Sequence, residues 1–124
     1  MDFILPIPEA PTPLRLLVEL VYFPGCPNVE RARAVLCRAL QEAGAPAVWK
    51  EWSTADPACP EVLCGLGSPT ILVNRADVAP GPHPWTPREA PMCRVYEDEG
   101  RLVGAPPLAR VVAAVTKALE PDVV

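Results

Sequence analysis

Proline content constrains this chain more than any other feature of its sequence. The 124 residues include 18 prolines, about three times the usual share of roughly 5%. Because proline has no backbone N–H and a fixed φ, it is excluded from the interior of helices and of central strands. The prolines concentrate in residues 6–13, 57–60, 80–91 and 106–107, and they leave proline-free stretches long enough for helices and strands. The sequence therefore predicts a compact core bordered by stiff, proline-rich segments.

The charge balance argues against a nucleic-acid partner. Eleven Lys and Arg residues stand against 15 Asp and Glu, which gives a net charge of −4 at pH 7. Arg31, Arg33 and Arg38 lie close together in sequence, but two acidic residues, Glu30 and Glu42, are interleaved with them. That mixture is typical of a solvated helix face. Nonspecific nucleic-acid binding requires a strongly basic patch, so we expect no nucleic-acid partner.

The apolar runs and the first residues argue against membrane insertion and export. No apolar run approaches the roughly 18 residues needed to span a bilayer. Residues 1–6 contain no basic region, and prolines interrupt the apolar stretch that follows. We therefore expect a cytoplasmic protein with no membrane partner. The five cysteines, an odd number, are then expected to be mostly reduced thiols rather than a disulfide framework.

The apolar periodicity predicts one domain after a short arm. Residues 1–13 form a proline-broken arm, and the domain covers residues 14–119. Within the domain, strands are predicted at 14–23, 47–52, 70–73, 92–96 and 101–103, and helices at 28–43, 61–64 and 107–119. The loop 75–91 carries no predicted element.

The order of these elements predicts the fold class. A full helix joins the first two strands, so they should be parallel, whereas the later strands are joined by turns and should be antiparallel. The run 14–23 is almost continuously apolar, which is typical of a central strand covered on both faces. We therefore predict an α/β domain of order β-α-β-α-β-β-α, with a mixed central sheet of four or five strands and helices on both faces.

The sharpest local feature is a cysteine between the first strand and the first helix. Cys26 follows the end of a buried strand, and Pro27 fits the first helical turn. Free backbone N–H groups and the helix dipole at such a place stabilise a thiolate. A small turn residue would also fit there, but the position favours a reactive thiol. A second feature is Pro69 at the mouth of the third strand, where a cis Ser68–Pro69 bond is expected.

Together these features resemble the thioredoxin fold. The order of elements, Cys26-Pro27 after the first strand, and a Gly-Ser-Pro-Thr turn at 67–70 before the third strand carry the resemblance. The chain is most similar to small bacterial thioredoxin-like proteins with Gly-Cys-Pro and Gly-Ser-Pro-Thr motifs, some of which are labelled as related to alkylmercury lyase. The resemblance covers roughly residues 15–119.

The resemblance implies both an activity and a set of site residues. Cys26 would be the nucleophile, and Pro69 would be cis and pack beside it. The residues implied to contact an extended peptide or a thiol substrate are Pro27, Ser68, Pro69 and Thr70. The implied activity is thiol–disulfide exchange or thiol transfer through a mixed disulfide, with a protein or a low-molecular-weight thiol or disulfide as partner and with no cofactor.

The chain departs from the dithiol pattern at two positions. Val29 stands where a second cysteine would lie three residues after Cys26, and Gly25 replaces the tryptophan that normally precedes the first cysteine. Three alternatives stay open: monothiol chemistry, resolution by a distant cysteine, or a site that has lost its activity. Cys64 is the leading candidate for a resolving thiol, because its segment leads into the turn at Pro69.

The other cysteines support weaker hypotheses. Cys37 lies on the apolar stripe of its predicted helix, where a buried free cysteine is common. Cys59 is a second candidate for the resolving role. Cys93 starts the predicted fourth strand, and similar proteins often carry a cysteine there.

Two other classes of function stay open. One is a noncatalytic adaptor that uses the loop 75–91, in which Trp85 stands among prolines. The other is a thiol site for a soft ion such as Cu(I) or Hg(II), built from four cysteines: Cys26, Cys59, Cys64 and Cys93. No cysteine or histidine spacing matches a zinc motif, so the leading interpretation includes no metal, and His83 is interpreted as a solvated loop residue.

Overall fold

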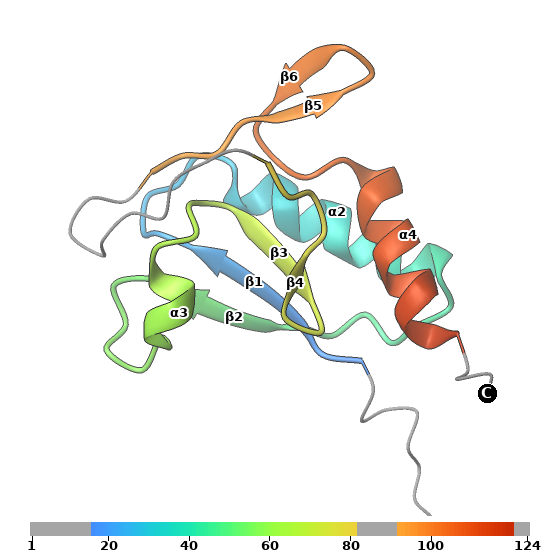
Figure 1. Ribbon diagram of the computed structural model, residues 1–124, viewed down its shortest axis with the longest axis horizontal. Helices are drawn as coiled ribbons and strands as arrows, with labels where there is room; N and C mark the ends of the chain where they lie inside the picture. The colour runs from blue at the N-terminus through green and yellow to red at the C-terminus, as the bar shows by residue number, and fades with distance from the viewer. Residues whose placement is uncertain (1–15, 82–91, 121–124) are drawn as a thin grey trace, which may run out of the picture.

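The apolar run near the start of the chain forms the central strand of the sheet. In the computed structural model, which describes residues 16–81 and 92–120, β1 (Val18–Tyr22) lies between β2 (Lys50–Ser53) and β3 (Thr70–Val73). Strand β4 (Ala76–Asp77) extends the sheet beyond β3 (Figure 1). The order is β2-β1-β3-β4, with β1 parallel to β2 and antiparallel to β3. The predicted mixed sheet is therefore confirmed.

Within residues 16–81 and 92–120, three helices and a hairpin complete the domain. The helices are α2 (Val29–Glu42), α3 (Glu61–Cys64) and α4 (Leu108–Leu119). Strands β5 (Tyr96–Asp98) and β6 (Arg101–Val103) pair with each other in a separate antiparallel sheet. This order confirms the predicted α/β class and the C-terminal helix.

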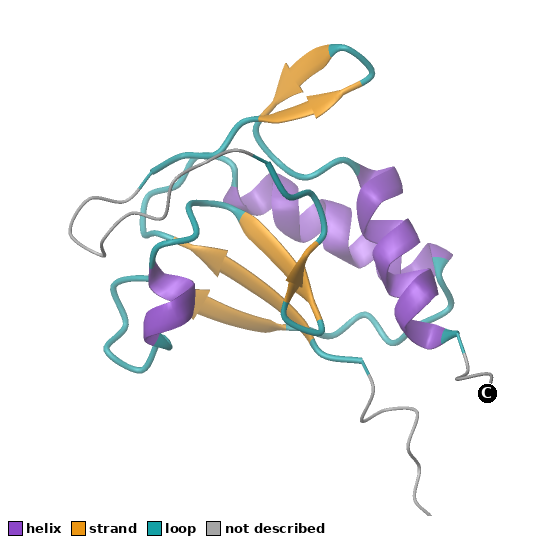
Figure 2. Ribbon diagram, in the orientation of Figure 1, coloured by secondary structure: helices purple, strands orange, loops and turns teal. Residues whose placement is uncertain are grey.

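Alternation of side chains along β1 and β3 separates two cores. Leu20 and its register partner Ile71 face the core that α2 and α4 cover. Val21 and Leu72 point to the opposite face, where they pack against Leu63 of α3. Figure 2 shows α2 and α4 together on one face of the sheet and the short α3 on the other. Both faces of β1 are thus buried, as its unbroken apolar sequence predicts.

The central strand also carries a buried carboxylate. Glu19 in β1 is 1% exposed. It accepts hydrogen bonds from Nε1 of Trp52 at 2.9 Å and from Nε of Arg75 at 2.7 Å. Burial of a charge is costly unless the charge is paired and hydrogen-bonded, and here each carboxylate oxygen has a donor. The ion pair between Glu19 and Arg75 also joins β1 to the turn between β3 and β4.

That turn is the first difference from the sequence prediction. Residues 76–77, expected in a loop, form β4 and pair with β3. Asn74 and Arg75 both have positive φ, at 51° and 69°, which is the backbone of a tight hairpin turn that usually contains Asn-Gly or Asp-Gly. Because arginine is unusual in that conformation, residues 74–75 carry no recognisable hairpin pattern. Leu17 stabilises the turn by donating its N–H to Oδ1 of Asn74 at 2.7 Å.

The strand predicted at 92–96 is the second difference. Strand β5 begins only at Tyr96, and the preceding residues make one isolated parallel bridge, between Cys93 and Ser68. The side chain of Arg94 is buried and fixes this segment against the loop before β3 instead of at the edge of the sheet. The predicted strand at 101–103 is confirmed as β6.

Two further predictions concern the N-terminal arm and membrane-spanning segments. The arm predicted at 1–13 lies outside the described residues. Over residues 16–81 and 92–120, no helix has the length and apolar character needed to cross a bilayer.

Replacing a core leucine tests the assignment of the central strand. Leu20→Ala should lower the free energy of unfolding by about 2–5 kcal/mol, because the fully buried side chain would leave a cavity. Leu102→Ala is the matched control. Leu102 lies in β6 and is 78% exposed, so its loss should change the same quantity by less than about 0.5 kcal/mol. Urea denaturation measures both, and equal losses would contradict the assignment.

Candidate functional site

Cys26 lies between the end of β1 and the start of α2, as the sequence predicts. Its N–H donates to the carbonyl of Phe23 at 3.1 Å, and its carbonyl accepts from the N–H of Val29 at 3.5 Å. Gly25 has a φ of 87°, a left-handed conformation that glycine adopts without a steric penalty. The thiol is free, and Cys26 is only 5% exposed. The loop therefore holds the cysteine in one place beneath the surface.

The turn before β3 lies against this loop. The Ser68–Pro69 bond is cis, as expected. Oγ of Ser68 accepts a hydrogen bond from the N–H of Phe23 at 3.2 Å, and the hydroxyl of Thr70 donates to the carbonyl of Gly67 at 3.0 Å. Ser68, Pro69 and Thr70 are all buried. The two motifs found in the sequence are thus adjacent in space, whereas Pro27 is exposed.

A third segment, residues 92–104, covers this place, and we call it the cover segment. Ser68 donates its N–H to the carbonyl of Met92 at 2.9 Å, and its carbonyl accepts from the N–H of Arg94 at 2.8 Å. Both backbone polar groups of Ser68 are therefore paired with the protein's own chain. Figure 1 shows the cover segment leading into β5 alongside the loop between β1 and α2.

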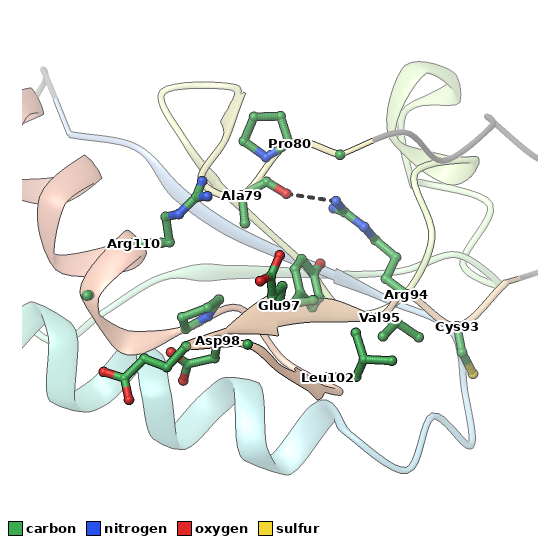
Figure 3. Close-up of a pocket in the computed structure, with 15 residues that line it drawn as sticks. Ala79, Pro80, Cys93, Arg94, Val95, Glu97, Asp98, Leu102 and Arg110 are labelled. Atoms are coloured by element: carbon green, nitrogen blue, oxygen red, sulfur yellow. Dashed lines mark hydrogen bonds between the residues drawn. The ribbon is translucent and has the colours of Figure 1, made fainter.

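Arg94 anchors the cover segment. The residue is 5% exposed, and its Nη1 lies 2.7 Å from Oδ2 of Asp77 and 3.1 Å from Oγ1 of Thr70. Nη2 donates to the carbonyl of Ala79 at 2.9 Å, as Figure 3 shows. The guanidinium also lies 4.6 Å from the ring centroid of Tyr96. These contacts join β3, β4 and the cover segment through one side chain.

Two glycines allow the cover segment to approach closely. A β-carbon at Gly67 would lie 2.7 Å from Cγ of Arg94, and one at Gly104 would lie 2.4 Å from the side chain of Asn28. Asn28 is two residues after Cys26. The end of the cover segment therefore packs directly on the segment that enters α2.

Tyr96, the first residue of β5, lies against the turn at Pro69. Its hydroxyl donates a hydrogen bond to the carbonyl of Pro69. Burial raises the pKa of the Tyr96 phenol above its ordinary value; the charge of Arg94 opposes this shift, and negative charge at Asp77 and at Cys26 adds to it. The phenol is therefore protonated at neutral pH.

The other four cysteines lie in the core beneath α3, on α2 and in the cover segment, where Cys93 forms a bridge with Ser68. Cys59 and Cys64 belong to the core beneath α3, where the Cys64 thiol lies 3.2 Å from the carbonyl of Pro60 and 3.5 Å from that of Cys59. Cys37 is partly buried on α2, and Cys93 is exposed. The five cysteines all lie within the described residues, and none of them forms a disulfide.

Metal-ligating side chains are spread over the molecule. Within the part of the chain that the structure describes, no group of three or more His, Cys, Asp or Glu side chains could hold a metal ion. The four cysteines considered for a soft ion all belong to that part, so they do not form such a group.

A cavity of about 810 Å³ opens beside the hairpin rather than at Cys26 (Figure 3). Its walls come from the loop after β4, from residues 93–100, from Leu102 and from the start of α4. Cys93 and Arg94 line it, together with the acidic residues 97–99. Most of the predicted loop 75–91, including His83 and Trp85, lies outside the described residues.

Arg94 and Tyr96 are the site residues that the sequence analysis missed. Arg94 stands inside the otherwise apolar run Met-Cys-Arg-Val-Tyr at 92–96. A charged residue in such a run indicates a buried ion pair or an edge position, but its partner Asp77 comes 17 residues earlier. No spacing rule connects the two.

Comparison with known proteins adds no family to this geometry. No protein-family model, curated protein or solved structure matches the chain. The function therefore has to be argued from Cys26, Ser68, Pro69 and the cover segment.

The alkaline stability of the protein should depend on Tyr96. An unfolded tyrosine loses its proton near pH 10, whereas the raised pKa keeps folded Tyr96 protonated. The unfolded state is therefore favoured progressively above about pH 10, and this part of the stability is lost as the pH rises. Tyr96→Phe should lower stability by about 1 kcal/mol at neutral pH, through the lost hydrogen bond, but should weaken the alkaline loss.

Urea midpoints at about pH 8 and about pH 11 measure the effect. Tyr22→Phe is the matched control, because Tyr22 is only partly buried, and this variant should keep the alkaline loss of the parent protein. An unchanged alkaline loss in Tyr96→Phe would contradict the assigned cause.

Proposed function

We propose that this chain is a thioredoxin-like protein of thiol–disulfide exchange that uses Cys26 as a monothiol nucleophile. One observation carries the proposal: the hydrogen bond from the N–H of Phe23 to Oγ of Ser68 joins the Cys26 loop to the turn at Pro69. The element order β-α-β before that turn and the cis bond within it agree with what the resemblance implies.

The start of α2 supports nucleophilic chemistry at Cys26. The helix contains 14 residues and begins three residues after the cysteine. Asn28 at its N-terminus makes no side-chain capping hydrogen bond, so the partial positive charge of the helix end faces the loop uncapped. A thiolate is stabilised by such a charge, and the thiolate is the form that attacks a disulfide.

The absence of a cysteine three residues after Cys26 favours a monothiol cycle. Val29 occupies the position of a local resolving thiol, and its N–H bonds to the carbonyl of Cys26. The Cys64 thiol lies against the carbonyls of its own helical turn. We therefore assign the resolving step to an external thiol, which attacks the mixed disulfide and releases Cys26.

A noncatalytic binding module is the second candidate. It is favoured by two apolar side chains of the cover segment, Val95 and Leu102, which are 64% and 78% exposed and line the cavity of Figure 3. In this interpretation the hairpin contacts a partner and Cys26 is inert. The reactivity of the thiol separates the two candidates.

Two equally buried cysteines provide an internal control for that reactivity. Cys26, Cys59 and Cys64 are 5%, 3% and 4% exposed. In a Cys93→Ser background, which removes the exposed thiol, 2-hydroxyethyl disulfide at neutral pH should form its mixed disulfide at Cys26 at least about tenfold faster than at Cys59 or Cys64. Peptide mapping by mass spectrometry measures the rates. Equal rates would contradict a nucleophilic role and favour the binding module.

A further inference from the structure

We propose that Cys26 exchanges only with low-molecular-weight thiols and disulfides, because residues 92–94 of the chain itself occupy the backbone position that an extended peptide would need. The inference rests on the proposed function and names its substrate class. It separates the two kinds of partner that the sequence leaves open.

The first argument concerns hydrogen bonds. An extended peptide binds to the edge of a folded chain by pairing with free N–H and C=O groups. Beside Pro69 those groups belong to Ser68, and they are bonded to Met92 at 2.9 Å and to Arg94 at 2.8 Å. A peptide substrate would have to break both bonds before it formed its own.

The second argument concerns the strength of the anchor. Displacing residues 92–94 would pull Arg94 out of a site where it bonds Asp77, Thr70 and the carbonyl of Ala79. Separating a buried ion pair leaves an uncompensated charge, which is strongly unfavourable. The side chain also fills the space beside Gly67, where no β-carbon would fit. The cover segment is therefore a fixed part of the fold.

The third argument concerns access to the sulfur. Cys26 is 5% exposed, Tyr96 is bonded to Pro69, and Gly104 packs on Asn28. A disulfide within a protein carries main chain on both sides of each half-cystine, and that main chain would collide with the cover segment. A small disulfide brings only the two sulfurs and short substituents.

The exchange itself needs no further reactant. Cys26 loses its proton to solvent, and the thiolate attacks one sulfur of R–S–S–R. A bond forms between Cys26 and S–R, the S–S bond breaks, and RS⁻ leaves with the electron pair and is protonated. A second small thiol, R′SH, then attacks the mixed disulfide as its thiolate, forms R–S–S–R′ and returns Cys26 as the thiolate. Two thiols and one disulfide are present before and after each step.

Two matched probes test the inference on the full chain with Cys93→Ser. One is the disulfide of N-acetylcysteine methylamide, and the other is the disulfide of the blocked peptide Ala-Gly-Cys-Gly-Ala, so that the leaving thiols are chemically alike. Each rate at Cys26 is divided by the rate of the same probe with a free model thiol. The normalised rate should be at least about tenfold higher for the small probe.

Equal normalised rates for the two probes would overturn the inference and leave the proposed function standing. Reaction with neither probe would instead overturn the proposed function, and the inference with it. Arg94→Ala releases the anchor, so it should raise the peptide rate toward that of the small probe. Arg101→Ala removes an exposed arginine of the hairpin and should leave the ratio unchanged.

Amide hydrogen exchange of the parent protein gives a readout that does not depend on whether Arg94→Ala folds. The N–H groups of Ser68 and Arg94 should exchange as slowly as those in the interior of β3, because all are held in one folded unit. Exchange as fast as that of exposed loop amides would overturn the inference, since the cover segment would then open readily to a peptide.

Discussion

The arrangement around Cys26 depends on the hydrogen bonds and the ion pair that the buried guanidinium of Arg94 makes. The guanidinium bonds to Thr70 in β3, to Asp77 in β4 and to Ala79 in the following loop. The backbone of Arg94 pairs with Ser68. A guanidinium is suited to this role because it presents several donors in a fixed plane. The backbone around Pro69 and the cover segment are thereby held by the same ion pair, and the hairpin is placed as a consequence.

A second arginine, which lies in the turn between β3 and β4, performs a comparable task. Arg75 bonds to the buried carboxylate of Glu19 in β1, and Arg94 bonds to Asp77 in β4. Strand β4 has only two residues, too few for backbone pairing alone to hold the edge of a sheet. The ion pairs fix this edge to the centre of the sheet and to the cover segment, so that the short strand has a defined register.

In the proposed function, Cys26 has to act as a nucleophile, whereas its burial restricts access to its sulfur. The proposed function assigns the attack to Cys26, which lies just before α2, yet the residue is almost fully buried. A covered nucleophile is protected from unselective oxidation, because oxidation of cysteine requires both thiolate character and exposure. In the proposed exchange, the same cover is what selects the disulfides that reach the sulfur. Cys93, which is exposed, has no such protection.

Local sequence patterns determined the helices, the buried central strand and the positions of Cys26 and Pro69, because apolar periodicity and proline placement act over a few residues. They did not determine the hairpin turn at Asn74 and Arg75, because arginine rarely adopts the positive φ that this turn requires. The role of Arg94 was decided only by the tertiary structure. Its ion pair with Asp77 and its bond to Thr70 span 17 and 24 residues, and pairing over such distances depends on how the sheet brings the chain back upon itself.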